Sequence, residues 1–449
     1  MNPIITTSKG AVEGRNVDGI DRFLGIPYAA PPFGAHRFLA PAPVAPWEGV
    51  RQGDAFGPTA PQRVGVASGG LPTVIEPTVA GDDILNLNVW TPAGREVPLP
   101  VLVWIHGGGF FEGSSANPWY DGAAFARQGL VVVSINYRFG AEGFLELEGA
   151  PSNRGLLDWV AALTWVHDEI AAFGGDPSRV TVMGQSAGGM AVSALLAAPA
   201  ARGLFLRAIL ASAVSDVSIW STVAARKVAD AVVAELGIPR TRDAAAAIDP
   251  AAFLEAHAVV LAAAQAQGEP IMPPWAPVVD GENLPGSVFD TIEAGADIPV
   301  LVGSTSNEFA WMAYRDNPDD TAKRDEGQRL FADGFFRVPI QRFAEARVAV
   351  GAAPTFRYEF AWQSQAAPYI RAGHSLDIPF FFHNLDAPYF ADYAGPNPPV
   401  ALADEMQGAF AAFVRDGDPG WAPYGEGRAV RLFDDPSWVG TDADLGLPA

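Results

Sequence analysis

A chain of 449 residues, of which 49% are hydrophobic and 18% charged, has enough apolar sequence to bury a large core, which excludes a disordered protein. Its formal net charge of −22 disfavours nucleic acids and anionic membrane surfaces as partners, because both would repel it. The chain has no cysteine, so disulfides, thiol catalysis and thiolate metal sites are excluded.

The amino terminus, MNPIITTSKG, shows no basic segment followed by an apolar run, and no uninterrupted apolar stretch reaches membrane-spanning length. No internal repeat or low-complexity linker divides the sequence. We therefore expect one domain over residues 1–449 in a soluble, cytoplasmic protein without a membrane partner. The sequence leaves the oligomeric state undetermined.

Apolar strand-like runs recur along the chain and alternate with helix-like segments. The runs cover residues 101–105, 130–136, 180–183, 208–212, 299–303 and 356–362. The clearest amphipathic helix pattern between them covers residues 154–173. Strands that alternate with helices predict an α/β fold with a central, mostly parallel sheet flanked by helices.

A glycine-rich segment, HGGGF at residues 106–110, follows the first of these runs directly. Glycines let backbone N–H groups approach a negatively charged oxygen that side chains would otherwise block, so the segment suits an oxyanion hole. A phosphate-binding loop is the weaker interpretation. No Lys-Ser/Thr pair follows the glycines, and no GxGxxG opens a helix.

The segment RVTVMGQSAGGMAVSALLAA, residues 179–198, joins a short β-branched strand to a helix-forming stretch through Gly-x-Ser-x-Gly. This pattern is a nucleophile elbow, in which the serine lies on a strained turn between strand and helix. A side chain at Gly184 or Gly188 would clash with the neighbouring backbone. Ser186 is therefore the candidate nucleophile, and it needs a base, an orienting carboxylate and oxyanion donors.

Two helix-like blocks interrupt the rhythm of the strands, one over about 221–265 and the other over about 309–353. Both suit cap segments that shape a substrate gorge. A structural helical layer fits the same patterns equally well, and whether either block moves as a lid stays open.

One of six histidines must be the base if Ser186 is the nucleophile. His374 lies late in the chain on a glycine-containing loop, which fits the order of nucleophile, acid and base in hydrolases with this elbow. His167 and His257 lie in helix patterns and His106 opens the glycine segment, so structural roles suit these three better.

Segments that match a known family extend over nearly the whole chain. They are FLGIPYAAPPFGAHRF (23–38), LNLNVWTP (85–92), VLVWIHGGGFFEGS (101–114), NYRFGAEGFL (136–145), residues 155–189 around the elbow, PVVDGENLP (277–285), STSNEF (304–309), GHSLDIPF (373–380) and FVRDGDP (413–419). On these segments the chain resembles the type-B carboxylesterases of the cholinesterase-like family, and bacterial carboxylesterases in particular. The resemblance implies an α/β-hydrolase fold with helical cap insertions.

The resemblance implies a triad of Ser186 as nucleophile, Glu308 as acid and His374 as base. The sequence agrees, because Glu308 follows the run at 299–303 by a short loop and catalytic groups gather beyond the carboxyl ends of such strands. A buried carboxylate there would fix the imidazole tautomer.

The resemblance also selects the N–H groups of Gly108, Gly109 and Ala187 as the oxyanion hole. It implies no metal and no organic cofactor. It places two bracing Arg–carboxylate pairs without a catalytic role: Arg37 with Asp82, and Arg138 with Asp176.

The chain departs from the family near the nucleophile. Gln185 stands where the family usually has Glu, which removes a negative charge and weakens any attraction for a cationic substrate. No Trp lies between Gln62 and Asp82, where cholinesterases have their aromatic face for choline. We take Gln185 and Trp220 as substrate-binding candidates, although Trp220 suits core packing as well as an acyl-pocket wall.

These observations predict a serine carboxylesterase that hydrolyses small to medium neutral esters through an acyl-enzyme, with a small-molecule ester as its partner. A non-catalytic cholinesterase-like binding protein is the alternative from another class, and an intact triad speaks against it. A lipase is a further alternative, but the sequence marks no clear lid. The physiological ester and the stereopreference stay undetermined.

Overall fold

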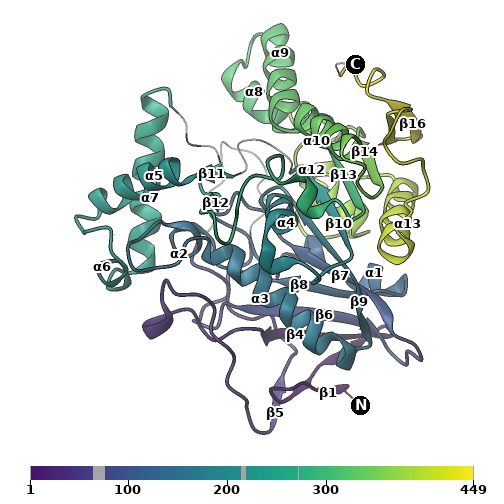
Figure 1. The fold of residues 1–449 in the computed structure, drawn as a ribbon. Helices are drawn as coiled ribbons and strands as arrows, with labels where there is room; N and C mark the ends of the chain where they lie inside the picture. Colours follow the sequence, from purple (N-terminus) through teal and green to yellow (C-terminus); the bar gives the residue numbers. More distant parts are fainter. Residues whose placement is uncertain (1, 64–75, 214–218, 270, 272, 448–449) are drawn as a thin grey trace.

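The computed structural model describes residues 2–63, 76–213, 219–269, 271 and 273–447. Within these ranges an eleven-stranded sheet runs through the molecule in the order β16-β15-β14-β13-β10-β9-β7-β8-β6-β4-β3 (Figure 1). Its strands are β3 (Arg15–Val17), β4 (Ile20–Pro27), β6 (Asn86–Pro92), β7 (Leu99–Ile105), β8 (Val131–Ile135), β9 (Gly175–Gln185), β10 (Arg207–Ala211), β13 (Val300–Thr305), β14 (Thr355–Phe360), β15 (Ala429–Phe433) and β16 (Trp438–Thr441).

The centre of this sheet is parallel and its two edges are antiparallel. The strands from β8 to β15 pair in parallel, whereas β16 at one edge and β6, β4 and β3 at the other pair antiparallel. All six predicted runs are strands of the parallel part, so the mostly parallel α/β sheet is confirmed. The described chain also has two small sheets. One contains β1 (Ile4–Thr6), β2 (Ala11–Glu13) and β5 (Val50–Gln52), and the other contains β11 (Trp220–Ser221) and β12 (Val278–Val279).

Helices cover both faces of the sheet, and each face has its own apolar core. Alternate residues of a strand point to opposite faces, so Val101 and Val103 of β7 enter one core while Leu102 and Trp104 enter the other. The first core is closed by α3 (Arg154–Glu169) and α4 (Ala187–Ala197), and the second by α1 (Ala123–Arg127), α11 (Ile378–Phe381), α12 (Phe390–Ala394) and α13 (Val400–Asp416). This three-layer arrangement confirms the α/β class.

Both blocks that interrupt the strands are helical. The first contains α5 (Thr222–Glu235), α6 (Arg242–Ala246) and α7 (Pro250–Ala266), and the second contains α8 (Ala310–Asp316), α9 (Thr321–Ala332), a π-helical turn (Asp333–Arg337) and α10 (Val338–Ala349). Figure 1 shows them as two separate groups beside the sheet. That they act as caps of one domain stays a prediction.

Shorter elements complete the described chain. They are α2 (Gly140–Phe144) and 3-10 turns at Gly34–His36, Pro118–Tyr120, Ile170–Phe173, Pro199–Ala201 and Ile292–Gly295. None of the helices in the described ranges combines the length and the apolar character that crossing a bilayer requires.

The two expected Arg–carboxylate pairs are wrong in their acidic partners. Arg138 binds Asp158 of α3 through Nε at 2.8 Å and Nη2 at 2.7 Å, with both side chains fully buried. Asp176 instead lies near the surface, where Arg179, three residues further on, binds it at 2.8 Å. The partner depends on which elements the fold brings together, and α3 runs past Arg138.

Arg37 likewise binds Glu142 of α2, with Nη2 at 2.6 Å, and not the exposed Asp82. Its Nη1 also donates to the carbonyl groups of Ala246 and Ile248 at the end of α6. Arg37 therefore joins the amino-terminal segment to the first helical block.

The buried pair gives a stability prediction. Asp158→Asn leaves the Arg138 guanidinium buried without its counter-charge, so we expect the free energy of unfolding to fall by about 3–5 kcal/mol. The control is Asp176→Asn, which breaks a partly exposed pair and should cost about 0–1 kcal/mol. Urea unfolding of the three proteins measures both values, and equal losses would contradict the assignment of Asp158 as the main partner.

Candidate active site

Ser186 lies on a sharp turn between β9 and α4. Its backbone has φ 56° and ψ −126°, a conformation that costs energy for a residue with a side chain. A Cβ at Gly184 would overlap the backbone of Gly188, and one at Gly188 would overlap the carbonyl of Ile105. The strand, turn and helix expected from the sequence are thus present, and Ser186 is half-buried rather than sealed in the core.

Glu308 and His374 are in direct contact. Nδ1 of His374 lies at a short hydrogen-bond distance from Oε2 of Glu308. The Glu308 side chain is fully buried and that of His374 is 12% exposed. A carboxylate at Nδ1 fixes the imidazole with its N–H on this side, which leaves Nε2 as a proton acceptor.

Ser212, which the sequence analysis did not single out, holds the other oxygen of Glu308. Oε1 accepts hydrogen bonds from Ser212 Oγ at 2.5 Å and from the Thr305 N–H at 2.9 Å. Ser212 directly follows β10, the neighbour of β13 in the sheet. Its position as a polar residue at the end of a predicted parallel strand was the sequence signal that could have identified Ser212 as a site residue.

Gln185 faces the other end of the imidazole. Its Nε2 lies 3.3 Å from Nε2 of His374 and donates to Ser375 Oγ at 3.0 Å. No hydrogen bond joins Ser186 Oγ to His374 in the described part of the chain. The structure therefore brings Glu308, His374 and Gln185 into contact, with Ser186 next to Gln185 at the start of α4.

The glycine segment borders Ser186. A Cβ at Gly107 would lie 3.2 Å from the Cβ of Ser186. Gly108 and Gly109 have φ values of 104° and 59°, which side chains rarely adopt. No described residue accepts a hydrogen bond from the N–H of Gly108, Gly109 or Ala187.

Gln62 holds the glycine segment at its far end. Its side-chain amide donates to the Gly113 carbonyl at 3.0 Å and accepts from the Gly113 N–H at 2.8 Å. His106 is fully buried and stacks on Tyr137 at 4.5 Å, and burial lowers its pKa to about 4. His106 is thus a neutral packing residue, as the sequence suggested.

Trp220 is half-buried in β11 and packs against the core beneath it. Among the described residues no hydrogen bond or ring contact joins Trp220 to Ser186, Glu308 or His374, so its role in a substrate pocket stays a prediction. Trp275 is fully buried and donates to His257 Nδ1 at 3.1 Å. His257 is thereby held in a structural contact, and His167 is exposed on α3.

Asp377 is a second buried carboxyl beside the triad acid. Its nearest polar partner is the Tyr358 hydroxyl, 3.5 Å from Oδ2, and its Oδ1 has no partner among the described residues. Burial, together with the negative charge of Glu308, raises the pKa of Asp377 to about 8. Because Glu308 and not Asp377 contacts the imidazole, the geometry favours Glu308 as the orienting acid.

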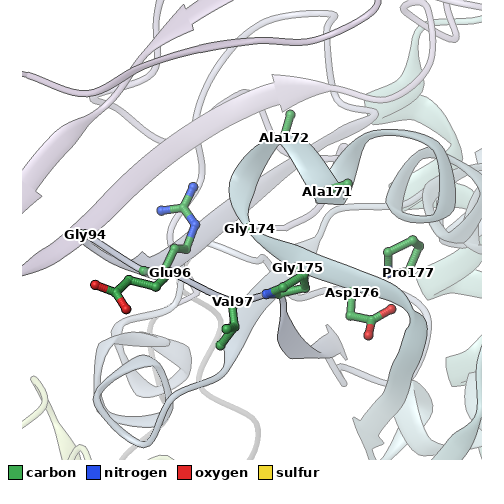
Figure 2. A pocket seen from close by; sticks show the side chains of 11 residues that line it. Gly94, Glu96, Val97, Ala171, Ala172, Gly174, Gly175, Asp176 and Pro177 are labelled. Carbon is green, nitrogen blue, oxygen red and sulfur yellow. The ribbon is translucent and has the colours of Figure 1, made fainter.

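A hollow of about 610 Å³ lies at the opposite end of the sheet. Figure 2 shows it between the β6–β7 connection, with Glu96 and Val97, and the start of β9, with Asp176. The regularly paired part of β9, residues 180–185, lies between the hollow and Ser186, which is roughly 20 Å at about 3.3 Å per residue. The hollow therefore takes no part in the arrangement around Ser186. In the described ranges no three His, Asp or Glu side chains converge to hold a metal ion.

Comparisons with known proteins show which proteins this chain is similar to. A model of the carboxylesterase family matches residues 1–328 and 314–427. The para-nitrobenzyl esterase of Bacillus subtilis (strain 168) is 36% identical over 96% of this chain and 94% of its own. The phenmedipham hydrolase of Pseudarthrobacter oxydans is 34% identical over 93% of this chain and 90% of its own.

Solved structures give the same result. A PNB esterase superposes with a TM-score of 0.87 at 33% identity, covering 99% of both chains. A Geobacillus stearothermophilus carboxylesterase superposes with a TM-score of 0.83 at 34% identity over 98% of both chains. These neighbours have the α/β-hydrolase fold, and the fold of this chain is the same.

The raised pKa of Asp377 gives a pH prediction. Between about pH 4 and pH 8 the folded chain binds more protons at this carboxyl than the unfolded chain, so this group destabilises the fold progressively as the pH rises. Asp377→Asn removes the effect, and its free energy of unfolding relative to the unmodified protein should increase with pH over that range. Urea unfolding at several pH values measures the difference. Asp386→Asn, at an exposed carboxyl, is the control, and a pH-independent difference for Asp377→Asn would refute the prediction.

Proposed function

The chain belongs to the carboxylesterase family, and from that premise we propose that it hydrolyses small to medium neutral carboxylic esters through an acyl-enzyme on Ser186. Membership makes the protein a carboxylic ester hydrolase. The observation that carries the finer proposal is the contact of His374 Nδ1 with the buried Glu308, beside a serine on a strained turn. The cytoplasm is the proposed location, since a chain without cysteine needs no oxidising compartment.

The proposed first half-reaction forms the acyl-enzyme. Ser186 Oγ attacks the ester carbonyl while Nε2 of His374 takes the serine proton. The Gln185 amide must release Nε2 for this step, because it occupies the same side of the ring. Glu308 stabilises the resulting imidazolium, which then protonates the departing alcohol.

The second half-reaction frees the enzyme. His374 activates a water molecule that attacks the acyl carbonyl, and the proton returns to Ser186 as the acid leaves. In both halves the N–H groups of Gly108, Gly109 and Ala187 would stabilise the tetrahedral oxyanion. Their conformations and their position beside Ser186 support this role.

The size and charge of the substrate follow from weaker observations. One relative is named for a para-nitrobenzyl ester, which supports a neutral ester with an aromatic alcohol. Gln185 brings no negative charge to the site. We therefore assign Gln185 and Trp220 to the substrate pocket as candidates, with a neutral ester as the ligand.

The triad predicts a large loss of activity on substitution. Ser186→Ala and His374→Ala should each lower ester turnover by roughly 10³–10⁶-fold without unfolding the protein, because the triad acts as a unit. Glu308→Gln should also cause a large loss, whereas Asp377→Asn should have a much smaller effect on kcat. Steady-state kinetics with a para-nitrophenyl ester measures these changes.

Reaction with an organophosphate tests whether Ser186 is an activated nucleophile. It should label the unmodified protein once, at Ser186, and should not label Ser186→Ala. A non-catalytic binding protein would not be labelled, and a lipase would gain activity at a lipid interface. Substantial turnover by Ser186→Ala, or a greater loss from Asp377→Asn than from Glu308→Gln, would refute the assignments.

Neutral aryl esters should be hydrolysed far better than the matching choline esters. Losing a cation–π contact, worth about 0.5–2 kcal/mol, could alone cost up to roughly thirtyfold in selectivity. Burial raises the pKa of Glu76 to about 8, so this carboxyl near the glycine segment carries little negative charge at neutral pH. The overall negative charge of the protein attracts cations, but salt screens it within about 8 Å.

The measurement compares kcat/KM for butyrylcholine and an aryl butyrate at moderate salt. Gln185→Glu is the informative variant, because it restores a carboxylate at this position and should improve the choline ester more than the aryl ester. Equal efficiency of the unmodified protein on both esters would mean that another aromatic residue, such as Trp220, forms a cation site.

A further inference from the structure

The ring of Phe309 covers one face of the imidazole of His374. The two ring centroids lie 4.2 Å apart with 24° between the planes, which is a stacked contact. Phe309 directly follows Glu308, so two consecutive residues contact the same imidazole. Glu308 binds its Nδ1 edge, and Phe309 covers its face.

The backbone adopts an unfavourable conformation to make this possible. Phe309 has φ 51° and ψ 33°, the left-handed region in which a residue with a side chain is uncommon. Hydrogen bonds hold the turn on both sides: the Asn307 N–H donates to the Ala372 carbonyl at 3.0 Å, and the Ala310 N–H donates to the Asn307 carbonyl at 3.0 Å. The first of these bonds ties the turn to the loop that carries His374. Strain of this kind persists where the surrounding contacts hold it in place.

The stacked ring suits the charge that the base acquires. When His374 takes the serine proton it becomes a cation, and the face of an aromatic ring attracts a cation. The contact is shielded, because the His374 side chain is only 12% exposed and the Phe336 ring lies 5.7 Å away. A shielded cation–π contact is stronger than an exposed one.

We propose that Phe309 is a positioning residue for His374: its ring fixes the plane of the imidazole between Glu308 and the Ser186 turn and stabilises the imidazolium formed during acyl transfer. This role rests on the proposed function for its effect on turnover. The contact with His374 can be tested independently of turnover.

Other groups around His374 bear on its titration. Glu308 contacts it directly, and Asp377 lies behind Glu308. Gln185 and the Tyr393 hydroxyl, which donates to the His374 carbonyl at 2.6 Å, are uncharged neighbours.

Two arginines of the elements packed nearby form ion pairs of their own. These pairs are Arg337 with Asp333 and Glu359, and Arg371 with Asp325. Substitution of Phe309 leaves all these charged groups in the chain.

The test compares Phe309→Leu, which keeps apolar bulk but has no π face, with Phe309→Tyr, which keeps the ring. Phe335→Leu is the matched control, because Phe335 stacks on Phe331 at 4.5 Å in the same aromatic cluster without a ring contact to His374. We expect Phe309→Leu to lower kcat by roughly 2- to 30-fold with little change in KM. Its acidic limb of kcat/KM should move to lower pH by roughly 0.4–1.5 units, because the cation loses its stabilisation. Phe309→Tyr and Phe335→Leu should stay near the unmodified protein.

A second measurement does not depend on ester hydrolysis. Histidine-labelled Ser186→Ala protein, with and without Phe309→Leu, allows the ring signals of His374 to be followed by NMR as the pH changes. His374→Gln identifies those signals among the six histidines. Loss of the stacked ring should shift the His374 signals through the ring current and move their titration to lower pH.

Unchanged ring signals and titration in Phe309→Leu would overturn the proposal, as would equal losses of kcat in Phe309→Leu and Phe335→Leu. If the unmodified protein neither turns over esters nor reacts with an organophosphate, the proposed function fails, and the NMR comparison still decides the role of Phe309. Thermal unfolding of each variant separates a loss of positioning from a loss of stability. Phe309→Gly repeats the kinetic test if Leu proves unstable, since glycine tolerates the positive φ.

Discussion

The bond between the buried Glu308 carboxylate and His374 is the interaction on which the rest of the site depends. A carboxylate without solvent contact is costly to bury unless every oxygen is hydrogen-bonded. Glu308 meets this requirement with Ser212 after β10, Thr305 at the end of β13 and His374 on the loop beyond β14. These three strands are neighbours in the sheet, so the same carboxylate that holds His374 also ties their carboxyl ends together.

Features of the fold that depend on neighbouring residues in the sequence could be predicted, whereas those that depend on distant residues could not. The central strands and the Ser186 turn are encoded by short apolar runs and by glycine spacing, and the structure contains them as expected. The partners of Arg37 and Arg138 could not be predicted in the same way, because which carboxylate lies nearest depends on the packing of α2 and α3. The antiparallel strands β3 and β4 are joined by Asp18-Gly19, with φ values of 49° and 82°, which is a hairpin signal that the predicted strands left out.

Within the site, the contacts that surround His374 were the hardest to predict. Ser212 reaches Glu308 across 96 residues of sequence, and the strained backbone of Phe309 has no sequence signature, since a Phe rarely adopts it. With Glu308 at one edge, Gln185 at the other and Phe309 on a face, little freedom is left to the imidazole. The ring itself therefore needs little reorientation when the proposed reaction begins, and the Gln185 amide is the group that must move away from Nε2.

The order of strands in the sheet has a consequence for biosynthesis. Strands β10, β13, β14 and β15 join one edge of the growing sheet in the order in which they are translated. Ser186, directly after β9, is made early, but its proposed base lies 188 residues later, at 374. Because contacts so distant in sequence form late, a nascent chain can build the centre of its sheet while it still lacks a complete triad. With the proposed triad, reactivity toward esters would arise only after residue 374 has been made.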